Sequence, residues 1–188
     1  MIKDRLKKRG IGTVKKQDIL ERGVNTVFLS IGTNLGNKKF NIEKIKSLIE
    51  LKNIKIVASS SLYSTPSWPN PNYPEYINIV VKIKTQMSLK KLFIFTKNIE
   101  KKMGRKIKIR NHPRICDIDI IDFNKENICL NVNSNQLIIP HPRMHLRNFV
   151  LFPLFEVQSD WIHPKFNQKI SNLLKNMSHN DITTIKLI

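Results

Sequence analysis

The chain has 188 residues, of which 40% are hydrophobic and 25% charged, with a formal net charge of +19. A chain of this length can bury a hydrophobic core as one domain without disulfide or metal staples. No apolar run approaches the roughly 18 residues that a bilayer-spanning helix needs, so we expect no membrane association. The positive charge suits nucleic acids, acidic membranes and polyphosphates alike, and a biased composition explains it equally well.

The domain organisation predicted from the sequence is simple. We expect residues 1–24 to be a mobile, basic N-terminal extension and residues 25–188 to form a single domain. The only two cysteines, Cys116 and Cys129, lack the C-x-x-C spacing of a redox or zinc motif. Reduced thiols are therefore expected, and with them a cytoplasmic location.

The first half of the predicted domain alternates strands with helices. Residues 27–31 (VFLSI) and 55–63 (KIVASSSLY) are strand-like, and Asn37 is placed to cap a helix between them. Residues 76–83 (YINIVVKI) form the clearest strand, because every second residue from Ile77 onward is branched and apolar.

The second half begins with a helix that Ser88 caps and Gly104 ends. A basic stretch then leads to a strand at 115–123 (ICDIDIIDF), followed by an Asn-rich loop at 124–136, a short strand and a mostly helical C-terminal part. The order strand, helix, strand, strand, helix, strand predicts an α+β, ferredoxin-like βαββαβ core with helices on one face of an antiparallel sheet. The C-terminal helical part is expected to extend this core.

The strongest chemical signal is the D-x-D pattern within the strand at 115–123. Side chains alternate across a strand, so Asp117 and Asp119 should share one face, and Asp122 should point the other way near the strand end. Two adjacent carboxylates repel each other unless a cation lies between them, and hard oxygen ligands favour Mg²⁺. The pattern therefore favours a magnesium site over an exposed acidic face.

Basic side chains flank this acidic pair on two predicted loops. They are Arg105, Arg110 and Arg114 before the pair and His141, Arg143, His145 and Arg147 after it. Arginine binds phosphate oxygens in a bidentate manner, so the group as a whole favours a phosphate site. Residues 32–36 (GTNLG) match neither the P-loop nor the dinucleotide-binding pattern, so arginines and metal would have to hold any nucleotide.

A second cluster is suited to a flat heteroaromatic ligand. Tyr76 and Asn78 share the strand face opposite the apolar stripe, and residues 65–68 (TPSW) lie in the loop before them. An amide can satisfy the polar edge of a ring while aromatic side chains cover its faces. Taken alone, this pattern favours ordinary packing of Tyr76 and Trp68 over a ligand site.

Taken together, these motifs resemble the 6-hydroxymethyl-7,8-dihydropterin pyrophosphokinase family. The resemblance covers residues 27–172, and its segments are IGTNLG, SSLYSTPSW, YINIVV, IEKKMGR, PRICDIDIIDF and IPHPRMHLRNFVLFPLFE. A P-R-x-x-D-[ILV]-D-[IL] signature followed by P-H-P-R-M is highly specific to that family.

The resemblance implies that the pterin hydroxymethyl oxygen attacks the β-phosphorus of ATP, giving the pterin diphosphate and AMP in folate biosynthesis. It implies two Mg²⁺ ions on Asp117 and Asp119, with Asp119 helping to remove the hydroxyl proton. The remaining implied contacts are Arg105, Arg114 and Arg147 with phosphates; Glu100, Arg110, His141 and Arg143 with the nucleotide; and Thr65, Pro66, Tyr76, Asn78 and Phe149 with the pterin, Phe149 stacking on the ring. A monomer whose partners are ATP and the pterin is expected.

Two departures from the family pattern leave alternatives open. Asn111 and His112 stand where many members place a tryptophan and a glycine, and Ser67-Trp68 replaces a commoner proline and small apolar residue. The alternatives are a paralogue that binds pterin without turnover, a nucleotidyl transferase that uses the same D-x-D pair, and an RNA-binding module, which the acidic pair disfavours.

Overall fold

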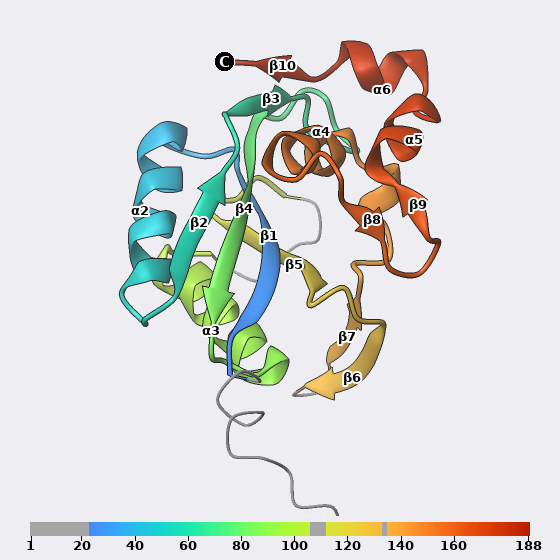
Figure 1. The fold of residues 1–188 in the computed structure, drawn as a ribbon. Coiled ribbons are helices and arrows are strands. Elements are labelled where there is room, and N and C mark those ends of the chain that lie inside the picture. Colours follow the sequence, from blue (N-terminus) through green and yellow to red (C-terminus); the bar gives the residue numbers. More distant parts are fainter. Residues whose placement is uncertain (1–22, 106–111, 133–134) are drawn as a thin grey trace, which may run out of the picture.

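The structure is a computed structural model that describes residues 23–105, 112–132 and 135–188. Its centre is a six-stranded sheet in the order β10-β3-β4-β1-β5, with β2 also pairing with β4 (Figure 1). All of these pairings are antiparallel. The strands are β1 (Asn25–Thr33), β2 (Lys55–Ser59), β3 (Tyr63–Thr65), β4 (Tyr76–Thr85), β5 (Asp117–Phe123) and β10 (Lys186–Leu187). The predicted α+β class is confirmed. The N-terminal extension predicted at residues 1–24 lies almost wholly outside the described residues.

Both helices predicted for the βαββαβ core form where their caps indicate. The side chain of Asn37 accepts a hydrogen bond from the Phe40 backbone N–H at 3.1 Å and begins α2 (Lys38–Glu50). Ser88 does the same for α3 (Leu89–Lys102), and Gly104 follows this helix with a positive φ of 89°. Glycine adopts that backbone conformation without steric cost, so the helix ends there.

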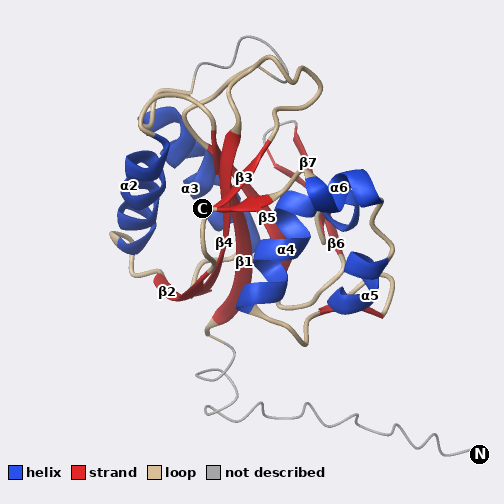
Figure 2. Ribbon diagram, turned by 90° about the horizontal axis from the view of Figure 1, so that it is seen from above, coloured by secondary structure: helices blue, strands red, loops and turns tan. Residues whose placement is uncertain are grey.

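Helices cover both faces of the sheet, rather than the one face that the sequence predicted. Figure 2 shows α2 and α3 on one side, where they bury the branched apolar stripes of β1 and β4. On the other side lie α4 (Asn148–Val157) and α5 (Ile170–Lys175), which pack with Phe28, Val80 and Trp161 into a second core. The second face is covered because the C-terminal part folds back across the sheet instead of extending beyond it.

A β-bulge corrects the prediction for Asp122. The pairing of β1 with β5 shifts between Phe28 and Leu29, which leaves Ile121 as an extra residue in β5. Asp122 therefore pairs with Phe28 and lies on the same face as Asp117 and Asp119. It is buried in the second core, where one of its oxygens accepts a hydrogen bond from Trp161 Nε1 at 2.6 Å. Simple alternation fails here because a bulge reverses the side-chain parity beyond it.

Short strands replace part of the predicted loops and helical tail. The predicted Asn-rich loop contains most of a hairpin of β6 (Ile128–Val132) and β7 (Asn135–Ile139). The tail adds the short hairpin of β8 (Ile162–His163) and β9 (Gln168–Lys169), and after α6 (His179–Thr183) β10 pairs with β3. A 3₁₀ turn (Met144–Leu146) precedes α4. No helix in the described ranges is both long and apolar enough to cross a membrane.

The second core makes the stability of the fold sensitive to acid. His163 is buried, and burial, reinforced by nearby His145 and Lys165, lowers its pKa from 6.5 to about 4. As the pH falls below 6.5 the unfolded chain takes up this proton before the folded chain does, so stability present above pH 6.5 is lost toward pH 4. From pH 7 to pH 5 this one group should remove about 2 kcal/mol of unfolding free energy. Urea unfolding should show that His163→Asn loses less unfolding free energy between pH 7 and pH 5 than the wild type does. An equal loss in the two proteins would contradict the assignment to His163.

Candidate active site

Asp117 and Asp119 lie at the edge of the sheet, above small cross-strand neighbours. β5 is the outermost strand, and its partners opposite the two carboxylates are Gly32 and Ser30 of β1. A side chain at Gly32 would bring its Cβ within 3.0 Å of Asn78 Oδ1. The glycine therefore leaves room for the Asn78 amide beside the acidic pair. This agrees with the prediction that Asn78 lies on the strand face opposite the apolar stripe.

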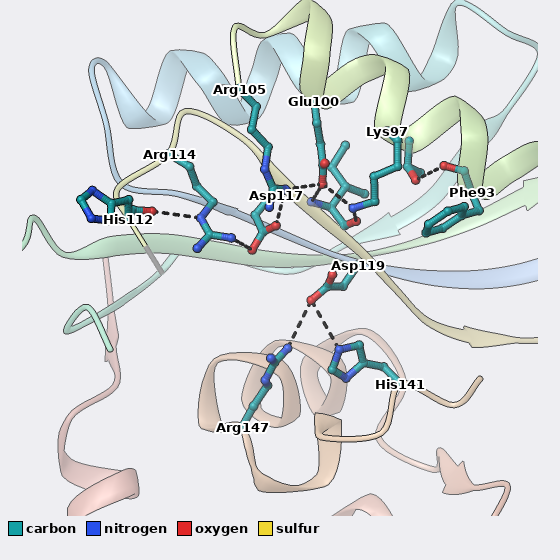
Figure 3. A network of polar contacts seen from close by, with 12 residues as sticks. Phe93, Lys97, Glu100, Arg105, His112, Arg114, Asp117, Asp119, His141 and Arg147 are labelled. Carbon is teal, nitrogen blue, oxygen red and sulfur yellow. Dashed lines mark hydrogen bonds and ion pairs between the residues drawn. The ribbon is translucent and has the colours of Figure 1, made fainter. Parts of the chain in front are cut away.

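Three arginines and a histidine surround the two carboxylates (Figure 3). Arg105 Nη1 lies 2.6 Å from Asp117 Oδ1, and Arg114 Nη1 lies 3.2 Å from Asp117 Oδ2. On the other side, Asp119 Oδ2 lies 3.2 Å from Arg147 Nη1 and 3.7 Å from His141 Nε2. The two predicted basic loops thus approach the acidic pair from opposite sides, as expected for a phosphate site.

This charge arrangement shifts the pKa values of the site. Burial by itself would raise the pKa of Asp119, but the positive charges of His141, Lys97 and Arg147 outweigh it and hold that pKa below the ordinary value. Burial lowers the pKa of His141, against the attraction of Asp119. Asp119 therefore stays ionised near pH 7.

Glu100 lies behind the acidic pair rather than among the residues that line the cavity. It is almost fully buried, and its Oε1 contacts Lys97 Nζ at 2.8 Å, Arg105 Nη1 at 2.7 Å and the Ile118 backbone N–H at 2.8 Å. Burial raises the pKa of Glu100 in spite of these partners. Its place indicates that Glu100 positions Arg105 and Lys97, and its place near the nucleotide, which the resemblance implied, stays a prediction.

The GTNLG segment holds the loop that carries Arg114. Asn34 is buried, its backbone N–H donates to Arg114 O at 3.0 Å, and its Oδ1 accepts from the Arg114 N–H at 2.6 Å. Its amide group also donates to Pro74 O at 3.1 Å, in the proline-rich loop. One asparagine therefore fixes two loops at the mouth of the site, a role that the sequence pattern did not indicate.

The predicted pterin-binding residues line the same cavity as the acidic pair. Asn78 Nδ2 donates to Thr65 Oγ1 at 3.0 Å, which orients the amide oxygen. The Arg147 guanidinium lies 5.4 Å from the centre of the Phe149 ring, at the start of α4. Together with the acidic pair these residues line a cavity of about 1220 Å³. Its predicted lining residues are Thr65, Pro66, Tyr76, Asn78, Arg105, Arg114, Asp117, Asp119, His141, Arg143, Arg147 and Phe149. Arg110 lies outside the described residues.

A second, smaller cavity of about 290 Å³ adjoins the first. Its apolar walls come from α3, β5 and β7, and they are Phe93, Ile118, Ile120, Leu137 and Ile138. Four charged or titratable residues line both cavities: Lys97, Asp119, His141 and Arg143. The junction between the two cavities therefore holds two cations, Lys97 and Arg143, together with one carboxylate and one imidazole.

Several lining residues were missed by the sequence reasoning. Lys97 lies on α3 among many other lysines, so composition does not single it out. Asn148 ties α4 to the C-terminal segment, because its Nδ2 donates to Asp181 O at 2.6 Å. Asn180, Asp181 and Thr184 also line the large cavity, and no sequence signal placed this C-terminal segment there.

Residues 28–159 match the model of the family described as 7,8-dihydro-6-hydroxymethylpterin-pyrophosphokinase (HPPK). The chain belongs to this family. The 2-amino-4-hydroxy-6-hydroxymethyldihydropteridine pyrophosphokinase of Bacillus subtilis is 34% identical over 71% of this chain and 78% of its own length. The enzyme of the same name from Haemophilus influenzae is 34% identical over 86% of this chain and 98% of its own length.

Other relatives are much longer than this chain. The folic acid synthesis protein fol1 of Pneumocystis carinii is 34% identical over 85% of this chain, which spans only 21% of that protein. Wild-type Plasmodium falciparum HPPK-DHPS, solved with pterin and p-hydroxybenzoate, has a TM-score of 0.68 at 19% identity and covers 88% of this chain and 45% of its own. This structural likeness supports the fold, whereas the HPPK family and the names of the bacterial relatives support pyrophosphokinase activity in folate synthesis.

Proposed function

We propose that this chain transfers a pyrophosphoryl group from ATP to the hydroxymethyl group of 6-hydroxymethyl-7,8-dihydropterin, giving the pterin diphosphate and AMP. The observation that carries the proposal is the acidic pair Asp117 and Asp119, flanked by three arginines and a histidine in a cavity of about 1220 Å³ that adjoins a second, smaller one. Transfer of a phosphoryl or pyrophosphoryl group depends on positioning and charge neutralisation more than on covalent chemistry by the protein. This cluster supplies both.

The two cavities offer separate places for the two substrates. The pterin ring fits the larger cavity beside Tyr76 and Phe149, where the Asn78 amide can satisfy the polar edge of the ring. The nucleotide base fits the smaller cavity, whose walls are apolar. The phosphates of ATP then cross the cationic junction between them, and the pterin hydroxyl meets the β-phosphorus beside the acidic pair.

Asp117 and Asp119 are the residues that would hold Mg²⁺, and we propose two ions. Their donor set fits, because Mg²⁺ is usually bound through one or two carboxylates together with substrate phosphates and water. Within the described ranges no three His, Cys, Asp or Glu side chains form a metal-binding group, so substrate and water oxygens would supply the other ligands. When bound, such ions neutralise phosphate charge and orient the attacking hydroxyl.

The protein groups have distinct roles in this proposal. Arg105, Arg114 and Arg147, which bind the carboxylates in the structure, are placed to transfer their hydrogen bonds to phosphate oxygens. Asp119 stays ionised and is therefore able to accept the proton that the pterin hydroxyl loses. His141 and Arg143 hold the nucleotide at the junction.

We also propose a fold topology, a domain boundary, an oligomeric state and a location for this chain. The strand order β5-β1-β4, with β2 and β3 both pairing with β4, supports a ferredoxin-like core. Residues 25–188 are proposed as one domain because β1 and β10 belong to one sheet. A monomer in the cytoplasm remains our prediction. RNA binding is disfavoured, because α4 covers the sheet face that an RRM-type binder presents to RNA.

A product assay tests the proposal directly. Purified protein is mixed with ATP, Mg²⁺ and 6-hydroxymethyl-7,8-dihydropterin, and the nucleotides and pterins are separated by chromatography. We expect AMP and pterin diphosphate in equal amounts, and neither without the pterin or without magnesium. ADP would indicate an ordinary kinase, and pyrophosphate a nucleotidyl transferase. Pterin binding without any product would indicate a non-catalytic paralogue.

A further inference from the structure

Lys97 stands out because an ion pair holds it at the exposed edge of the sheet. Among the described residues β5 has no strand on its outer side, so both backbone groups of Ile118 require partners from elsewhere. The Ile118 N–H donates to Glu100 Oε1 at 2.8 Å, and Lys97 Nζ donates to Ile118 O at 3.3 Å. The pair Lys97–Glu100, joined at 2.8 Å, therefore takes the place of a neighbouring strand (Figure 3).

This fixed position puts the ammonium group at the junction of the two cavities. Lys97 lines both of them, and its Nζ lies 5.7 Å from the centre of the Phe93 ring, which forms part of the apolar wall of the smaller cavity. Its side chain is 39% exposed, so a ligand can reach it. Two of its three donor hydrogens have acceptors among the described residues, which leaves one for a ligand.

We propose that Lys97 binds the polyphosphate of ATP at this junction and thereby sets the affinity of the site for a nucleoside triphosphate. The inference rests on the proposed function, since it assumes a base in the smaller cavity and the pterin in the larger one. Any polyphosphate that connects them must pass Lys97. Glu100 limits the freedom of the lysine, so little conformational entropy is lost when a phosphate oxygen binds.

The test compares substitutions at Lys97 with the same change at Lys101, one turn further along α3, which is exposed and lines neither cavity. Binding of adenosine and of a non-hydrolysable α,β-methylene analogue of ATP is measured by calorimetry with Mg²⁺ present. Lys97→Met should weaken binding of the analogue about tenfold, the value expected for one lost hydrogen bond to a charged group. Adenosine binding should not change, Lys97→Arg should restore the analogue's affinity, and Lys101→Met should behave as wild type.

The outcomes separate this inference from the proposed function. Equal loss of adenosine and analogue binding in Lys97→Met would indicate a purely structural role at the sheet edge and would overturn the inference, as would unchanged binding of both. Lys97→Gln adds a check, because its amide can still donate to Ile118 O but carries no charge, so it too should lose affinity for the analogue only. Wild-type protein that binds the analogue yet forms no pterin diphosphate would refute the proposed function while leaving the result for Lys97 valid.

Discussion

Replacing either Asp117 or Asp119 by alanine should reduce turnover by about a thousandfold or more while leaving the fold intact. Each substitution removes one of the two carboxylates proposed to hold Mg²⁺, and the loss of a single preorganised electrostatic group already costs about 100- to 1000-fold in other enzymes. The formation of AMP and pterin diphosphate measures the effect. Thermal unfolding should change little, because both carboxylates are partly exposed and lie outside the two cores.

Two further variants test whether the loss of turnover is specific to the carboxylates of the acidic pair. Asp160→Ala removes a carboxylate that is exposed and does not line either cavity, so it should retain wild-type turnover. Asp119→Asn keeps the shape of the side chain but loses its charge, and it should need more Mg²⁺ to reach half of its own maximal rate. Wild-type turnover in both alanine variants would refute the role of the acidic pair.

The acidic pair was predictable because its strand follows the simplest rule of β-structure. From Cys116 to Ile120 the side chains alternate, with the apolar ones in the first core and the two carboxylates on the other face. The same rule failed at Asp122, only three residues later. A bulge is set by packing against a second core whose residues, apart from Ile121, lie 22 or more positions from Asp122 in the chain, and no local pattern reports it.

The arginines were predictable as a group, whereas Lys97 was not. Arg105, Arg114 and Arg147 belong to segments that flank the D-x-D pattern, so their position in the sequence suggested their position in space. Lys97 is one of 33 lysines and arginines, and in sequence it looks like any exposed helical lysine. Its importance depends on α3 lying along the outer edge of β5, which is a tertiary contact.

The contacts of the C-terminal segment could not be predicted from the sequence either. β10 has two residues, too few for a periodic signal, yet it completes the sheet through pairing with β3. Asn148 looks like an ordinary polar residue at a helix start, and only the structure reveals that it connects α4 with Asp181. Contacts between segments so far apart in the chain are not encoded in spacing, so this wall of the large cavity went unpredicted.

The second large effect should come from Trp161, which is fully buried in the second core. Trp161→Ala removes a large aromatic ring from among Phe28, Ile121 and Leu154 and should lower the free energy of unfolding by about 3–5 kcal/mol. Domains are commonly stable by only about 5–15 kcal/mol, so a large share of the protein should be unfolded or aggregated at 37 °C. Urea unfolding followed by circular dichroism measures the loss.

Trp161→Phe distinguishes the contribution of the apolar ring from that of the hydrogen bond between Trp161 and Asp122. Phenylalanine keeps most of the apolar volume, but Asp122 loses the Nε1 donor in a buried site, which should cost about 1–3 kcal/mol. The chain's other tryptophan, Trp68, is 72% exposed and provides the control, because Trp68→Ala should leave the unfolding free energy nearly unchanged. Equal stability of Trp161→Ala and Trp68→Ala would mean that the second core contributes little. In that case α4, which begins beside Arg147 and carries Phe149, would have to be held against the sheet by other contacts, among them the hydrogen bonds of Glu156 to Ser61 and Tyr63.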